Sequence, residues 1–146
     1  MQTAEQRARN GRKSRNKGKA GEREVIQMLQ PVVTQVYELF DLEPPRLQRN
    51  SLQSDGGGSD IHGLDWMALE VKFCATPAVE QWWAQTTRQA GRNRVPILFY
   101  RTNNQRWRVV MFGMLGTPSV SHTCRVTVEV ADFVKWFRQK LTEELS

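Results

Sequence analysis

The sequence predicts an α/β domain in which helices flank a central mixed β-sheet, and two observations lead to this prediction. Apolar residues recur at the spacing of a helix face around residues 25–40, 79–90 and 133–141, whereas the segments between them alternate or run continuously as strands do. These segments follow one another as helix, strands, helix, strands and helix, an order typical of a mixed sheet with helices packed on it. The 146 residues suit one domain with a modest core.

Charge divides the chain into two unequal parts. The whole chain contains 21 Lys and Arg residues against 15 Asp and Glu residues, a formal charge of +6. Residues 1–19 hold seven basic residues and one acid, Glu5, and so carry +6 alone, whereas residues 20–146 hold fourteen residues of each sign and are neutral. The first segment is polar and interrupted by Gly and Asn, so we expect a disordered basic arm at 1–19 and a single domain at 20–146. The arm is either a solvated tail or a segment that binds phosphates without reading sequence.

The elements of the domain are expected in a definite order. The first helix begins at Ala20 and either ends at Pro31 or gives way there to a second helix. Glu22 and Glu24 fall in its first turn, where the helix dipole favours acids. The remaining elements are a strand at 46–50, a Gly-rich loop at 54–59, strands at 60–62 and 67–73, a helix from Pro77 to about Ala90, strands at 95–100 and 106–112, a loop at 113–121, a strand at 125–130 and a helix at 132–145.

The strands at 60–62 and 67–73 bring acidic side chains to one face. If they form an antiparallel hairpin centred on Asp65, residue 61 pairs with residue 69 and Asp60 lies opposite Glu70, with Cβ atoms about 5 Å apart. Like charges in such a position are destabilising, and Lys72, on the same face as Glu70, supplies one compensating charge. Mg²⁺ held by both carboxylates would supply the rest, since it prefers hard oxygen ligands. The alternative is a surface hairpin on which the three side chains are merely solvated.

An ordered set of motifs makes the interpretation more specific. The segments are Lys17-Gly18-Lys19-Ala20-Gly21-Glu22-Arg23-Glu24, Arg49-Asn50-Ser51, Ser59-Asp60-Ile61, and Leu69-Glu70-Val71-Lys72. Together they resemble the motifs of archaeal-type Holliday junction resolvases, in the PD-(D/E)XK nuclease superfamily, and look most like a phage or prophage member. The likeness extends from Lys17 to Phe112. It implies the restriction-endonuclease-like fold and a Mg²⁺-dependent endonuclease that resolves four-way DNA junctions by paired symmetric incisions, leaving 5′-phosphate and 3′-hydroxyl ends.

The resemblance also implies a role for each site residue. Glu22, rather than its neighbour Glu24, would complete a metal site with Asp60 and Glu70, which would hold Mg²⁺ or, in its place, Mn²⁺. The remaining assignments are Lys72 to orient the attacking water or stabilise charge on the phosphorane, Gln85 to hold water or a phosphate, and either Ser51 or Ser54 as the family's loop serine. Ser59 stands where the superfamily often has Pro, a residue without chemistry of its own.

Branched DNA is the expected partner, and a homodimer is expected because a four-way junction needs two symmetric incisions. The residues expected to contact DNA are Arg12, Lys13, Arg15, Lys17, Lys19, Arg46, Arg49, Ser51 and Arg88. Two alternatives stay open: an endonuclease of the same fold that acts on flaps, forks or duplex, and a non-catalytic DNA-binding module.

Other classes of protein are disfavoured. No apolar stretch approaches the roughly 18 residues of a membrane span, and no apolar core follows the basic N-terminus as in a secretory signal. Cys74 and Cys124 are far apart and fit no zinc spacing, as expected for reduced thiols. We therefore expect a cytoplasmic protein, in the host cytoplasm if phage-encoded, without a membrane partner or a small-molecule cofactor.

Overall fold

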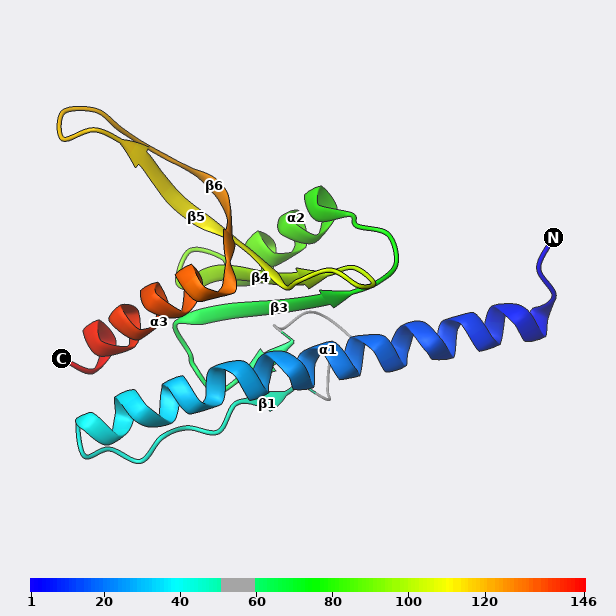
Figure 1. Ribbon diagram of the computed structural model, residues 1–146, viewed down its shortest axis with the longest axis horizontal. Coiled ribbons are helices and arrows are strands. Elements are labelled where there is room, and N and C mark those ends of the chain that lie inside the picture. Colours follow the sequence, from blue (N-terminus) through cyan, green and yellow to red (C-terminus); the bar gives the residue numbers. More distant parts are fainter. Residues whose placement is uncertain (51–59) are drawn as a thin grey trace.

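The computed structural model describes residues 1–50 and 60–146, and its centre is one mixed β-sheet (Figure 1). The sheet has the order β1-β2-β3-β4-β5-β6, and among the described strands only β3 and β4 run parallel. The strands are β1 (Gln48–Arg49), β2 (Ile61–His62), β3 (Met67–Phe73), β4 (Val95–Arg101), β5 (Arg108–Gly116) and β6 (Ser121–Glu129). The expected Gly-rich loop at 54–59 lies outside the described residues. The α/β class and the mixed sheet with flanking helices are thus confirmed.

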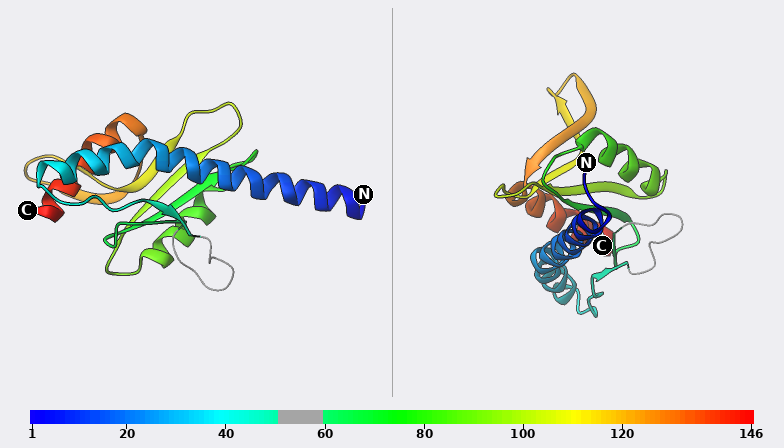
Figure 2. Two further views of the ribbon diagram at one scale, coloured as in Figure 1. Left: turned by 90° about the horizontal axis from the view of Figure 1, so that it is seen from below. Right: turned by 90° about the vertical axis from the view of Figure 1, so that its right-hand side faces the viewer.

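Helices cover both faces of the sheet. The long helix α1 (Ala4–Leu39) and the C-terminal helix α3 (Val130–Leu145) pack on one face, and α2 (Val79–Ala90), which connects the parallel strands, packs on the other (Figures 1 and 2). Since side chains alternate along a strand, β3 and β4 are buried on both sides. This arrangement places Glu70 of β3 in the interior, beneath α2, rather than on an open surface.

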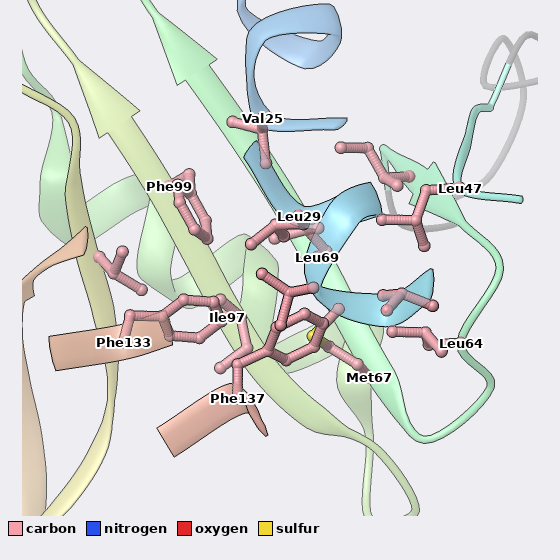
Figure 3. Packing of buried hydrophobic residues seen from close by; sticks show 14 of the residues in the cluster. Val25, Leu29, Leu47, Leu64, Met67, Leu69, Ile97, Phe99, Phe133 and Phe137 are labelled. Carbon is pink, nitrogen blue, oxygen red and sulfur yellow. The ribbon is translucent and has the colours of Figure 1, made fainter. Parts of the chain in front are cut away.

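The hydrophobic core lies between the sheet and the helices α1 and α3. Leu69 and Phe99 of the central strands meet Leu29 of α1 and Phe133 and Phe137 of α3 (Figure 3). These five side chains have no measurable exposure to solvent. The apolar stripes predicted for the two helices are therefore what fixes them on this face.

The first 19 residues differ from the expected disordered arm, because α1 is one continuous helix from Ala4. Thr3 caps it: its side chain accepts a hydrogen bond from the Gln6 N–H, and the Gln6 side chain accepts one from the Thr3 N–H. Ala, Arg, Lys and Gln are good helix formers, and a helix already nucleated in the body extends at little cost per residue. The N-terminal half of α1 projects beyond the sheet (Figure 1).

Pro31 does not end α1, contrary to the expectation of a break there. A proline inside a helix costs roughly 3 kcal/mol. Here the buried residues Leu29, Val32 and Val33 anchor the helix on both sides of it. Glu22 and Glu24 consequently lie in the middle of α1, not in its first turn.

The β5–β6 hairpin is longer than expected. Instead of a loop over residues 113–121, β5 continues to Gly116 and β6 begins at Ser121. The hairpin rises well away from the body of the sheet (Figure 1). Elsewhere the strands and helices lie within a few residues of their predicted bounds. Within the described ranges, no helix is long and apolar enough to span a membrane.

Candidate active site

Asp60 and Glu70 lie side by side in the interior. Ile61 pairs with Leu69, which confirms the register predicted for this hairpin, and the Asp60 N–H donates to the Leu69 carbonyl oxygen at 3.0 Å. Asp60 Oδ2 accepts a hydrogen bond from the Val71 N–H at 2.8 Å. The exposed fractions are 7% for Asp60 and 1% for Glu70. The interpretation of these residues as solvated surface groups is therefore wrong.

The two carboxylates cannot both carry full charge at low cost. Burial raises the pKa of Glu70 to about 9, and the charge of Asp60 and a hydrogen bond with it add to the effect. The charge of Lys72 lowers the pKa of Glu70 and the charge of Glu22 raises it, so both side chains lie within electrostatic range of Glu70. In the protein without a cation, Glu70 is protonated at neutral pH.

Glu22 approaches the pair from α1. Its pKa is raised, mainly by burial and further by the charge of Asp60, while a hydrogen bond with Arg49 lowers it. Arg49 Nε lies 2.6 Å from Glu22 Oε2. Arg49 comes from β1, so this ion pair ties α1 to the edge of the sheet that carries Asp60.

Glu24 has a different role from its neighbour. Its carboxylate accepts a hydrogen bond from the Trp107 indole N–H at 2.8 Å and lies 3.4 Å from an Arg101 nitrogen. The Arg101 guanidinium in turn stacks 4.1 Å from the centre of the Phe73 ring. The structure therefore brings Glu22, and not Glu24, toward Asp60.

Gly21 allows α1 to come this close to the sheet. A Cβ atom at this position would lie 3.1 Å from Phe73 Cβ and 3.2 Å from the Trp107 ring. Such distances are tighter than ordinary van der Waals contact, so a larger residue would displace the helix. Because Glu22 is the next residue, this close packing sets how near its carboxylate comes to Asp60.

Lys72 and Gln85 complete the predicted catalytic set. Lys72 is half-buried and points to the same face of β3 as Glu70. Gln85 is half-buried on α2, next to Thr86, which is fully buried beneath the same helix. The role of Gln85 stays a prediction, and Ser51 and Ser54 lie outside the described residues.

The donor set suits a hard divalent cation. In the part of the chain that the structure describes, no three His, Cys, Asp or Glu side chains are arranged together to hold a metal ion. Glu22 is held instead in its ion pair with Arg49. Asp60 and Glu70 still fit Mg²⁺, which proteins often bind through one or two carboxylates together with water and substrate phosphate.

The basic residues expected to contact DNA are spread over several elements. Arg12, Lys13, Arg15 and Lys19 are exposed on the projecting part of α1, Arg46 is exposed before β1, and Arg88 is exposed on α2. Lys17 differs, because its ammonium donates to Asn103 Oδ1 and lies 5.5 Å from the centre of the Phe73 ring. Lys17 therefore fastens α1 to the body, a role that its sequence context does not indicate.

Two sets of contacts are not predictable at the level of sequence. The Glu22–Arg49 ion pair joins residues 27 positions apart, and the sequence indicates only a DNA contact for Arg49. Trp82 and Trp83 of α2 both contact aromatic rings of the sheet, those of Tyr100 and Phe112 respectively. No local spacing signals either arrangement, because each depends on how distant elements are brought together.

No protein-family model, curated protein or solved structure matches this chain. The chemistry of the site therefore has to be argued from the residues themselves.

Proposed function

We propose that this protein is a Mg²⁺-dependent endonuclease with the PD-(D/E)XK fold that resolves four-way DNA junctions by paired symmetric incisions. The observation that carries the proposal is the buried Asp60–Glu70 pair with Lys72 on the same face of the sheet. Two adjacent buried carboxylates that are both ionised lower the stability of the protein unless a cation is bound between them. Strongly shifted pKa values of this kind are concentrated at functional sites.

Each residue has a distinct task in this proposal. Asp60 and Glu70 would hold Mg²⁺ or Mn²⁺, and Glu22 would join them when it is released from Arg49. When bound, the cation lowers the pKa of a water molecule and neutralises phosphate charge. Lys72 donates a hydrogen bond that orients the attacking water or stabilises charge on the phosphorane, and Gln85 positions water or a phosphate oxygen.

Phosphate binding falls to the arginines around the site. Arg49, which pairs with Glu22, would exchange this carboxylate for a phosphate, since both are anions that its guanidinium binds in the same manner. Arg46 and Arg88 are exposed and extend the contact surface along a DNA branch. A twofold homodimer is part of the proposal, because two sites related by symmetry match the two cuts that a junction requires.

Cleavage of a synthetic four-way junction tests the proposal. We expect wild type to cut it with Mg²⁺, and Asp60→Asn or Glu70→Gln to lower the rate by roughly a thousandfold, as is typical when a group that stabilises developing charge is lost. Glu80→Gln is the matched control, because that carboxylate is exposed and paired with Arg125 away from the site. Equal rates for wild type and all three variants would overturn the proposal.

Further measurements separate the alternatives. Flaps, forks and duplexes are cut in parallel at matched salt, because binding driven by charge hides selectivity at low salt. If the protein cuts one of these structures faster than the junction, that structure takes the place of the junction as the proposed substrate. Tight binding of the junction without cleavage in Mg²⁺ or Mn²⁺ would indicate a non-catalytic binding module. Light scattering on the free protein and on its junction complex tests the expected dimer.

A further inference from the structure

The projecting part of α1 carries most of the excess charge of the protein. It belongs to the same helix as Glu22 and extends beyond the sheet as an isolated rod (Figures 1 and 2). Residues 4–19 contain seven basic side chains and a single acid, Glu5. Because the helix is continuous, the orientation of these side chains relative to Glu22 is fixed.

The cations lie on one side of the rod. At about 100° per residue, Arg9, Arg12, Lys13, Arg15 and Lys19 fall within a sector of about 160°, which we name the basic stripe. The stripe lies opposite the side on which α1 buries its apolar residues in the core. Its middle lies about 140° around the helix from the middle of that buried side, and only Arg15, which shares the direction of Val33, borders it.

Without a bound partner, repulsion among the charges of the basic stripe destabilises the helix that carries them. Four pairs of its members, 9/12, 9/13, 12/15 and 15/19, are three or four residues apart, a spacing at which like charges destabilise a helix by roughly 0.2–0.5 kcal/mol per pair. A row of phosphates would reverse this effect by pairing with each cation in turn. The rod has no apolar face, so it does not suit a membrane surface or a hydrophobic groove on another protein.

We propose that the basic stripe docks on the backbone of a duplex branch and that α1, as a rigid rod, sets the distance between that branch contact and the cleavage site. The inference rests on the proposed function for the choice of DNA as the partner. Arg9 and Glu22 are separated by thirteen positions, or roughly 20 Å of helix at 1.5 Å per residue. That length corresponds to roughly six base pairs of duplex at 3.4 Å each.

Insertions that turn the rod test the proposal. Two alanines placed after Asn16 turn the stripe by about 200°, whereas four turn it by about 400°, close to its original direction, and lengthen the rod by about 6 Å. Neither insertion alters charge, and both precede Lys17, which fastens α1 to the body through Asn103. Hydroxyl-radical footprints and affinities on a four-way junction are measured in a Glu70→Gln background.

The two insertions are expected to behave differently. With four alanines, affinity stays within about threefold of the parent and the protected region extends by about two base pairs. With two alanines, affinity falls at least tenfold and protection of the branch disappears. If both insertion variants bind like the parent with unchanged footprints, the arm is a flexible tether and the proposal is overturned. The proposal is also overturned if the parent does not bind DNA.

The inference and the proposed function can fail separately. Protection that follows the rotation of the helix, in a protein that cuts no DNA, would support the rod and refute the endonuclease. Metal-dependent cleavage by wild type, with footprints indifferent to the insertions, would support the endonuclease and refute the rod. Circular dichroism of both insertion variants establishes that the helix is retained.

Discussion

Asp60 and Glu70 place two carboxyl groups in the interior, where the charge of Asp60 opposes the ionisation of Glu70. The pKa of Glu70 is raised to about 9 in the folded protein, against 4.5 as its ordinary value. Between these two values the folded state holds a proton that the unfolded state has released. The contribution of Glu70 to stability is therefore greatest below pH 4.5 and is lost as pH rises toward 9, at up to about 1.4 kcal/mol per pH unit.

Replacing Glu70 by Gln is expected to stabilise the protein in the absence of divalent cations. The amide keeps the size of the side chain but cannot ionise, so the free energy of unfolding near pH 8 rises by about 1–4 kcal/mol. The difference between the variant and wild type should widen from pH 5 to pH 9. Urea denaturation in EDTA across this range measures it.

Glu43→Gln is the control for this experiment, because Glu43 is exposed. It should leave the free energy of unfolding within about 0.5 kcal/mol of wild type at every pH. A Glu70→Gln protein that is less stable than wild type throughout the range would show that the ionised carboxylate contributes to the fold. Addition of Mg²⁺ is expected to stabilise wild type and not the Glu70→Gln variant.

Arg49 competes with a metal ion for the carboxylate of Glu22. Replacing Arg49 by Gln removes that competing cation, so the Mg²⁺ concentration at half-maximal cleavage should fall by about two- to fivefold, as expected for the loss of a partly exposed ion pair. The affinity for the junction should fall at the same time, because glutamine cannot replace the charge that Arg49 offers to a phosphate. Metal titrations of the cleavage rate and binding measured in Ca²⁺ separate the two effects.

Arg46→Gln serves for comparison, because Arg46 is also basic and close in sequence but is exposed. It should weaken DNA binding without changing the metal requirement. If Arg49→Gln raises the Mg²⁺ requirement, the ion pair assists metal binding and does not compete with it.

Among the helices and strands, the sequence predicts structure best where the apolar residues repeat with one regular spacing. Alternation along 67–73 predicts β3 and its pairing with residue 61, because a shift by one residue would move every apolar side chain out of the core. The juxtaposition of Asp60 and Glu70 follows from that register alone. The ion pair between Glu22 and Arg49 does not, because it depends on where α1 crosses the sheet.

Two elements differ from the prediction because their local composition suggests irregular structure. The glycines in the β5–β6 hairpin are positions of close approach: a Cβ at Gly113 would lie 2.7 Å from Val126, and one at Gly116 would lie 2.5 Å from the Val120 carbonyl oxygen. The first part of α1 lacks an apolar face, which is why its sequence predicts disorder. Its helix is instead an extension of the packed part, so no buried stripe is required.

Gly21 and Gly18 provide a matched pair of substitutions on α1. Gly21→Val would collide with Phe73 and Trp107, so we expect a loss of about 1–3 kcal/mol of stability and a fall in cleavage of about a hundredfold as Glu22 is displaced. Gly18→Ala meets nothing within 4 Å and should stabilise the helix by about 0.5–1 kcal/mol with cleavage unchanged. Thermal denaturation and junction cleavage report on both.

Equal effects of the two substitutions would contradict this account of α1. A Gly21→Val protein that loses stability but cuts normally would show that the approach of α1 serves packing and not the site. Gly21→Ala, which demands a shift of only a few tenths of an ångström, should lie between wild type and Gly21→Val in both measurements.

Across the whole molecule, positive charge and candidate chemistry are separated in space. The excess of +6 lies on the projecting half of α1, whereas the body is neutral. The acids of the candidate site contribute to that neutrality. Because the body has no net charge, long-range attraction of DNA has to come from the rod, whereas Arg46, Arg49 and Arg88 act on phosphates only at close range.

Deleting residues 1–16 tests this division. The deletion removes Arg7, Arg9, Arg12, Lys13 and Arg15 but retains Lys17 and its hydrogen bond to Asn103. The dependence of log affinity on log salt should become shallower by roughly 0.9 for each phosphate that the truncated protein no longer neutralises, and affinity at low salt should fall steeply. Metal-dependent cleavage at saturating protein should persist, because Glu22, Asp60 and Glu70 remain in place. If the truncated protein keeps its fold but no longer cuts at saturation, the rod contributes to the reacting site itself, and attraction and chemistry are not separable.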